Sequence, residues 1–154
     1  MNLQQLSMIA VTVAGVLGPS WSPPLDPPLR VSAPYSLPHG PYAAGHRGID
    51  IPAAAGAAVH APAGGTVSYV GTVVDRSIVS LQIDAHTVVS FEPVVSELRV
   101  GDSLARGERI GRVAAGGHCA SHCLHMGVRV SGQYVNPLRF LRPRPVLLPI
   151  GGSG

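Results

Sequence analysis

The stretch Val-Ser-Leu-Gln-Ile at residues 79–83 decides the fold prediction, because apolar and polar side chains alternate along it. The stretch Thr-Val-Ser-Tyr-Val at 66–70 alternates in the same way. A period of two is typical of a β-strand with one buried face. The full set of predicted strands, each a short apolar run between turn residues, spans 48–51, 58–61, 66–70, 78–83, 87–92 and 124–130. We therefore predict an all-β fold, a compact sandwich or barrel of antiparallel strands.

The composition of the chain excludes several classes of function. The chain has 154 residues, 45% of them hydrophobic and 12% charged, which suits one folded domain and not a charge-driven disordered protein. Its 11 basic residues are all arginine. Without lysine, Schiff-base chemistry, a P-loop and attachment of biotin or lipoate are excluded. The arginines are scattered and aromatic residues make up only 5%, so no nucleic-acid surface is expected.

The two ends of the chain differ from its middle. Residues 6–17 are nearly all apolar, too short to span a membrane but suited to a secretory signal, although no Arg or Lys precedes them. A misplaced start or a buried N-terminal helix is the alternative. We predict a leader at 1–22, a proline-rich linker at 23–40, a working domain at 41–141 and a flexible tail at 142–154. A secreted or cell-wall-associated monomer is expected.

Two segments of the predicted domain share a pattern. In residues 56–67 and again in 101–111, apolar residues flank a glycine turn. Both segments resemble the hammerheads of biotinyl and lipoyl carriers and of related duplicated hybrid-motif folds. A carrier needs a modified lysine at a hairpin tip, and this chain has none. The same fold type with another function remains.

Histidines supply the chemistry of two short motifs. On a strand, His46 and Asp50 point to the same face, because they are four residues apart. His125 shares a face with Cys123, while the intervening apolar residues form a core stripe. Two histidines and one carboxylate form a zinc set that leaves a position for water. Each motif alone is weak, since a histidine on a strand is usually structural.

Taken in order, these motifs resemble a known family. Gly45-His-Arg-Gly-Ile-Asp50, the two hammerhead segments, Leu124-His-Met-Gly-Val128 and Tyr134-Val-Asn-Pro-Leu138 look like lysostaphin/LytM-type zinc endopeptidases. Those enzymes cleave peptide cross-bridges of bacterial peptidoglycan. The resemblance covers 41–141 and implies that His46, Asp50 and His125 bind zinc. It also implies a peptidoglycan peptide as the partner.

The chain departs from the family at two positions, so it looks like a divergent member. Two further active-site histidines of the family fall on Pro93 and Cys123. His118 and His122, just before the third ligand, are candidates to replace them as acid–base groups, although both can also be surface histidines. Glu92 is a further candidate. The resemblance thus implies a zinc peptidase, or alternatively a catalytically degenerate member that binds wall peptide or regulates another wall hydrolase.

The state of the two cysteines also affects whether the chain is a zinc peptidase or a non-catalytic member. In an oxidising compartment, Cys119 and Cys123 are expected to form a disulfide that pins the loop beside the zinc. A Cys123 thiolate is instead able to act as a fourth ligand, which would make the site structural. Two free thiols are the third alternative.

Overall fold

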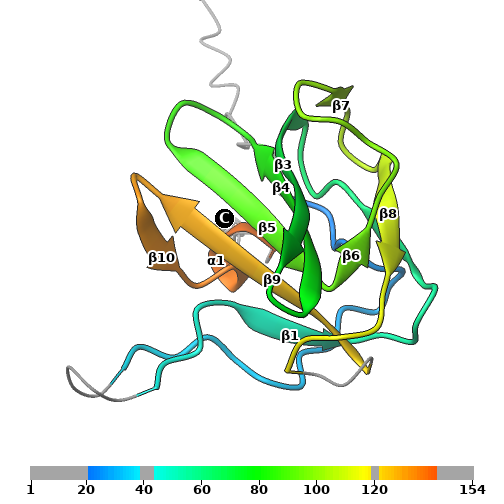
Figure 1. Cartoon of the computed structure of the whole chain (residues 1–154). Coiled ribbons are helices and arrows are strands. Elements are labelled where there is room, and N and C mark those ends of the chain that lie inside the picture. The colour runs from blue at the N-terminus through cyan, green and yellow to red at the C-terminus, as the bar shows by residue number, and fades with distance from the viewer. Residues whose placement is uncertain (1–20, 39–43, 119–121, 142–154) are drawn as a thin grey trace, which may run out of the picture.

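The computed structural model describes residues 21–38, 44–118 and 122–141, and almost all of its regular structure is β (Figure 1). The elements are β1 (Ile49–Pro52), β2 (Ala58–His60), β3 (Gly65–Val73), β4 (Arg76–Gln82), β5 (Thr87–Glu92), β6 (Val94–Val95), β7 (Ser103–Leu104), β8 (Arg109–Val113), β9 (Cys123–Val130), β10 (Gln133–Val135) and α1 (Leu138–Leu141). The predicted all-β fold is confirmed, and all six predicted strands are present. No helix in the described residues is long and apolar enough to cross a membrane.

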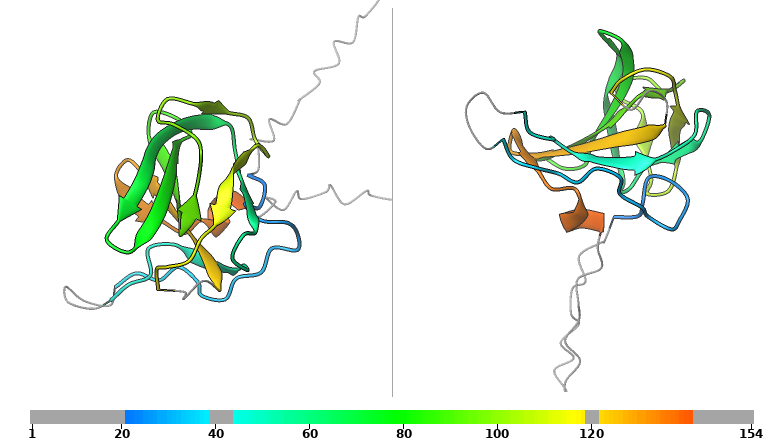
Figure 2. Two further views of the ribbon diagram at one scale, coloured as in Figure 1. Left: turned by 45° about the vertical axis from the view of Figure 1, so that its right-hand side comes forward. Right: turned by 90° about the horizontal axis from the view of Figure 1, so that it is seen from below.

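The strands form two antiparallel sheets. The larger has seven strands in the order β1-β9-β5-β4-β3-β7, with β10 pairing with β9. The smaller has three strands in the order β2-β8-β6. Every strand pairing is antiparallel. Figure 2 shows the large sheet curling, with the small sheet beside one end of it.

The central strands have one apolar and one polar face. Along β9, Leu124, Met126 and Val128 are fully buried, as the core stripe predicts. Val79 and Leu81 of β4 are buried in the same core. On the opposite face, these and the neighbouring strands carry mainly polar side chains, among them Ser80, Ser90, His125 and Arg129. The polar face of these strands is therefore available for a functional site.

The elements that the alternation pattern did not predict are all short. Strands β6, β7 and β10 have two or three residues, too few to show a period, and α1 has four. β8 has five residues, but its buried Ile110 and Val113 are three apart and do not alternate. β8 lies in the second hammerhead segment, and β10 in the segment that resembles the family's closing strand. Strands β7 and β8 pair with β3 and β2, which are distant in the sequence, whereas β10 forms a hairpin with β9. Tertiary pairing therefore decides that these residues form strands.

The described part of the proline-rich stretch, 21–38, packs against the domain. Trp21 is 8% exposed and stacks on Phe140 with 4.5 Å between the ring centroids. Further along, Ala33 and Ser36 form antiparallel bridges to Asp50 and His46. The stretch is extended, as proline requires, but its carbonyls and remaining amides pair with the free edge of β1. The sequence predicts a proline-rich linker at 23–40, and in the described residues 21–38 this stretch lies along the edge of the domain.

Other predicted segments fall outside the described residues. These are most of the leader at 1–22, the tail at 142–154 and Cys119. The predicted boundaries and the Cys119–Cys123 disulfide therefore stay predictions.

Candidate metal centre

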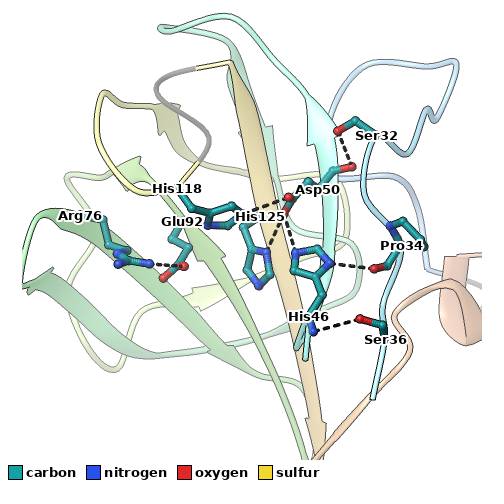
Figure 3. A network of polar contacts seen from close by, with 9 residues as sticks. All are labelled: Ser32, Pro34, Ser36, His46, Asp50, Arg76, Glu92, His118 and His125. Carbon is teal, nitrogen blue, oxygen red and sulfur yellow. Dashed lines mark hydrogen bonds and ion pairs between the residues drawn. The ribbon is translucent and has the colours of Figure 1, made fainter. Parts of the chain in front are cut away.

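The three predicted metal ligands converge at one point, and His118 joins them (Figure 3). One ligand atom from each of these four residues lies within 4.8 Å of the other three. Oδ1 of Asp50 is 3.0 Å from Nε2 of His46 and 2.7 Å from Nδ1 of His125. Oδ2 of the same carboxylate is 2.9 Å from Nε2 of His118. The carboxylate of Asp50 is thus the centre of the cluster.

The pairing of β1 with β9 brings the ligands together. Asp50 and His125 are direct partners in the register of this pair, so their side chains lie on the same face. His46 precedes β1 and is held by its bridge to Ser36. The prediction that the flanking Ile49 and Ile51 face the core is confirmed, since they are 0% and 3% exposed. Burial of these two isoleucines fixes the direction of the Asp50 side chain between them.

Gly48 occupies the narrowest point of the site. A Cβ atom there would overlap the carbonyl oxygen of Met126 and lie 2.7 Å from Nε2 of His125. Real Cβ atoms essentially never approach so closely. The glycine of the His-Arg-Gly-Ile-Asp motif is therefore needed so that β1 can approach β9 closely enough to bring Asp50 to His125.

The donor set fits a zinc ion. Nδ1 of His46 lies 2.8 Å from the carbonyl oxygen of Pro34, which can only accept, so Nδ1 carries the proton. With Nδ1 protonated, Nε2 of His46 faces a carboxylate oxygen of Asp50 at 3.0 Å, and a cation, either a proton or a metal ion, would bridge these two atoms. Two imidazole nitrogens and a carboxylate oxygen are zinc donors, about 3.3 Å apart in a tetrahedral site. The observed 2.7 and 3.0 Å separations between Oδ1 of Asp50 and the two imidazole nitrogens are close to that value.

Burial and hydrogen bonding tune the ionisation of the ligands. Burial of Asp50 opposes its ionisation, but hydrogen bonds from His125 and His118 and the charge of His46 outweigh it and hold the pKa of Asp50 below its usual value. Burial lowers the pKa of His125 more than its contact with Asp50 raises it. At neutral pH the cluster therefore contains a carboxylate and a neutral His125, the protonation states that metal binding requires.

His118 reaches the cluster on a glycine turn. Gly116 and Gly117 have φ angles of 110° and 71°, a region that favours glycine. A Cβ at Gly117 would contact Cδ of Pro93 at 4.0 Å, so the turn runs beside this proline. His118 is 45% exposed in its side chain, against 9% for Asp50. It was predicted as an acid–base group, and the structure places its Nε2 within reach of the metal site.

The other predicted residues lie around this centre but not in it. His122 is exposed, and its backbone carbonyl accepts a hydrogen bond from Ala53. Cys123 is buried at the start of β9 and is not part of the four-residue cluster. Pro93 offers only its carbonyl, which accepts from the amide of Ala114. Glu92 forms an ion pair with Arg76 at 3.2 Å.

A groove on the polar face of the large sheet begins at the metal centre. It has a volume of about 710 Å³. Its lining includes His125, Glu92, Arg76, Ser80, Ser90, Gly127, Arg47, Arg129 and Tyr134. None of the arginines or Tyr134 was predicted as a functional residue. The period of two along β9 places Arg129 on the same face as His125 and is the signal that identifies it.

Comparisons with known proteins agree with this geometry. The sequence profile described as peptidase family M23 matches residues 44–137. An uncharacterized protein of Mycobacterium tuberculosis, Rv2891, is 36% identical over 138 residues, which cover 85% of this chain and 55% of the relative. The chain thus spans about half the length of the curated relatives it matches.

Solved structures share the fold. A zinc-containing peptidase from Vibrio cholerae superposes with a TM-score of 0.67 at 18% identity, over 77% of this chain and 39% of that one. The catalytic domain of the antimicrobial peptidase lysostaphin from Staphylococcus simulans gives 0.64 at 21% identity, over 73% and 92%.

Proposed function

Because the chain belongs to peptidase family M23, we propose that it is a zinc peptidase that hydrolyses peptide bonds in bacterial peptidoglycan. The observation that carries the proposal is the convergence of His46, Asp50 and His125 on one point. The carbonyl of Pro34 supports the proposal further, because it pairs with Nδ1 of His46 while Nε2 faces the carboxylate of Asp50. Such a site is suited to a divalent cation.

The three ligands would hold the metal with one position left for reactants. A zinc ion in such a site polarises a carbonyl and makes water a nucleophile near neutral pH. Asp50 and His125 are held by the paired strands β1 and β9, and His46 by Pro34 and Ser36. The ligands are therefore positioned before any substrate arrives.

His118 is the imidazole that we assign to proton transfer. The family histidines that would serve this purpose fall on Pro93 and Cys123. His118 lies on a different loop but brings Nε2 to 2.9 Å from Oδ2 of Asp50, and its side chain is partly open to solvent. An imidazole in this position is able to accept a proton from an attacking water and pass it to a leaving amine. His122 remains an alternative for this role.

The groove gives the substrate its direction. It begins at His125 and continues over a polar surface in which Oγ of Ser80 and Oγ of Ser90 are 2.7 Å apart. A groove lined by hydroxyl groups suits an extended peptide with many backbone hydrogen-bonding groups. The groove therefore supports a peptide as the substrate.

One observation favours a second candidate, a non-catalytic member of the family. His118 lies close enough to act as a fourth metal donor. Four protein donors would close the site, and closed four-coordinate zinc is structural. A protein of this kind would bind wall peptide in the groove or regulate another wall hydrolase without cleaving it.

Two measurements on the purified full chain separate these candidates. Elemental analysis should find about one zinc per chain, and cross-linked peptidoglycan should be cleaved in a chelator-sensitive reaction. His118→Ala should retain zinc and lose about 10²–10⁴-fold in rate. His122→Ala should keep the rate unless His122 is the proton-transfer group, and His86→Ala, at an exposed position outside the cluster, is the matched control. Full zinc without chelator-sensitive cleavage would support the non-catalytic candidate, and absence of zinc would overturn the metal site.

The cellular setting is part of the proposal. We propose a secreted or wall-associated monomer that follows a leader at 1–22, with Cys119 and Cys123 joined in a disulfide. The support comes from the apolar run at 6–17 and from the family, whose substrate lies outside the cytoplasm. Mass spectrometry of the exported protein, with and without reductant, tests both the leader and the disulfide.

A further inference from the structure

The groove contains a second feature, away from the metal, at which arginines collect. Strand β9 places His125, Gly127 and Arg129 on one face, since they alternate with the core residues Leu124, Met126 and Val128. Tyr134 of β10 is the register partner of Arg129. Strands β9 and β10 lie side by side at one edge of the large sheet (Figure 1). Arg129 and Tyr134 therefore form one wall of the groove.

Two guanidinium groups share the ring of Tyr134. Cζ of Arg47 is 5.6 Å from the centroid of this ring, and Cζ of Arg129 is 5.8 Å from it. Arg47 comes from the loop before β1 and Arg129 from β9, so separate segments bring two positive charges to one aromatic side chain. Cation–π contact limits the motion of both arginines and leaves their N–H groups available.

The charges of these two arginines are not balanced within the groove. Arg76 also lines the groove, but it is paired with Glu92 at 3.2 Å and with Asp75 at 3.1 Å. Among the described residues, neither Arg47 nor Arg129 has a carboxylate within ion-pair distance. One end of the groove is therefore neutralised near the metal, while the other end is positive.

We propose that Arg47, Arg129 and Tyr134 form a subsite for a carboxylate group of the substrate peptide. This inference rests on the proposed function, because it assigns the substrate class of the same groove. Arginine guanidinium groups bind carboxylates through paired N–H donors, and the ring of Tyr134 keeps two of them at this part of the groove. A peptide of neutral residues alone has no group that would use it.

The spacing of the subsite defines where the carboxylate lies. Gly127 and Arg129 are two and four residues from His125 on an extended strand, which places them about 7 and 13 Å along the groove. A Cβ at Gly127 would lie 3.6 Å from Cε1 of Tyr134 and 3.8 Å from Nε2 of His125. The glycine therefore leaves the passage between metal and subsite open. The carboxylate should belong to a residue about two to four positions from the cleaved bond.

Peptidoglycan stem peptides carry such carboxylates, whereas bridges of glycine do not. The subsite therefore predicts that this chain prefers a stem peptide with free carboxylates over one whose carboxylates are amidated. Since both arginines are exposed, the preference should decrease as ionic strength rises.

Calorimetric titration of the full chain with a stem tetrapeptide tests the subsite. The probe is used with free carboxylates and with every carboxylate converted to a carboxamide, and the protein is used zinc-loaded and after chelation. Chelation removes direct binding of the carboxylate to zinc. We expect the free-carboxylate peptide to bind the chelated chain about tenfold more tightly than the amide.

Variants test whether the two arginines cause the preference for the free-carboxylate peptide. The double variant Arg47→Gln with Arg129→Gln should lose the preference, and each single variant should lose part of it. Arg99→Gln removes an exposed positive charge outside the groove and should retain the preference. Equal binding of both peptides by the unaltered chain, or an equal loss in Arg99→Gln, would overturn the subsite.

The binding measurements test the subsite separately from the peptidase activity. Chelator-sensitive cleavage without any preference for the carboxylate would leave the proposed function intact and remove the subsite. Arginine-dependent binding of the peptide without cleavage would leave the subsite intact and remove the peptidase proposal.

Discussion

The imidazole of His46 is held from behind by Pro34, whose carbonyl oxygen lies 2.8 Å from Nδ1. Pro34 belongs to the extended stretch that runs along the free edge of β1, twelve residues before the ligand it supports. A backbone carbonyl behind a metal-binding histidine fixes the tautomer and the direction of the ring. In this chain a segment rich in proline therefore acts as the outer support of the candidate metal centre.

Removal of one amide from this support should weaken metal binding. The amide of Ser36 donates to the carbonyl of His46 at 3.0 Å, and Ser36→Pro removes that donor. We expect zinc affinity to fall by about 10–100-fold, the usual cost of disturbing an outer support of a ligand. Competition with a chromophoric chelator measures the change. Ser36→Ala retains the amide and is the control, so equal affinity in the two variants would contradict the prediction.

A methyl group at Gly48 should separate the two ligand strands. In Gly48→Ala, the new Cβ overlaps the carbonyl of Met126 and approaches Nε2 of His125 to 2.7 Å. The strands must move apart, and Asp50 then loses its position opposite His125. We expect at least about a tenfold loss of zinc affinity, together with a lower melting temperature. Gly107→Ala, whose Cβ would meet nothing within 4 Å but would be strained by a φ of 84°, reports the cost of strain without a clash at the site. The same zinc affinity in both variants would argue against this role of Gly48.

Loss of charge at the centre of the cluster should abolish metal binding while retaining the shape of the side chain. Asp50→Asn removes the carboxylate that three imidazoles contact. We expect the zinc content after gel filtration to fall from about one per chain to a small fraction of that value, because a ligand and a negative charge are both lost. Asp84→Asn, at an exposed turn outside the cluster, is the matched control. Zinc retained by Asp50→Asn would show that the metal binds elsewhere.

Trp21 should contribute measurably to the stability of the domain. Its ring is buried and stacks on Phe140 at an angle of 24°. Trp21→Ala should lower the free energy of unfolding by about 3 kcal/mol, since a large buried aromatic side chain is lost. Urea unfolding measures the change, and Leu37→Ala, at a position 66% exposed, should stay within about 0.5 kcal/mol of the unaltered chain. A negligible effect of Trp21→Ala would show that the segment before residue 41 is not part of the folded unit.

The short apolar runs and alternating stretches were sufficient to predict β1, β2, β3, β4, β5 and β9. In β4 and β9 the period of two is strong, because one face is in the core and the other lines a polar groove. Strands β6, β7, β8 and β10 could not be predicted in this way, since they are short or have no alternation. Their formation depends on partners such as β2 for β8 and β9 for β10.

The metal ligands were predictable in part. His46 and Asp50 are four residues apart, and the pattern alone places them on one face. His125 is 75 positions after Asp50, and the residue pattern showed only that it faces the polar side. Its assignment as the third ligand came from the family resemblance. The role of Pro34 could not be predicted, because a backbone carbonyl leaves no mark in the sequence.

The sequence by itself determined the all-β class, the two buried isoleucines that flank Asp50 and the absence of any lysine chemistry. These properties depend on local periodicity and composition, which the chain has before it folds. Only the tertiary structure decided that His118 joins the metal cluster, that the proline-rich stretch supports His46, and that Arg47 and Arg129 meet at Tyr134. Each of these depends on the antiparallel pairing of segments far apart in the chain, and that pairing is set by the burial of the whole core.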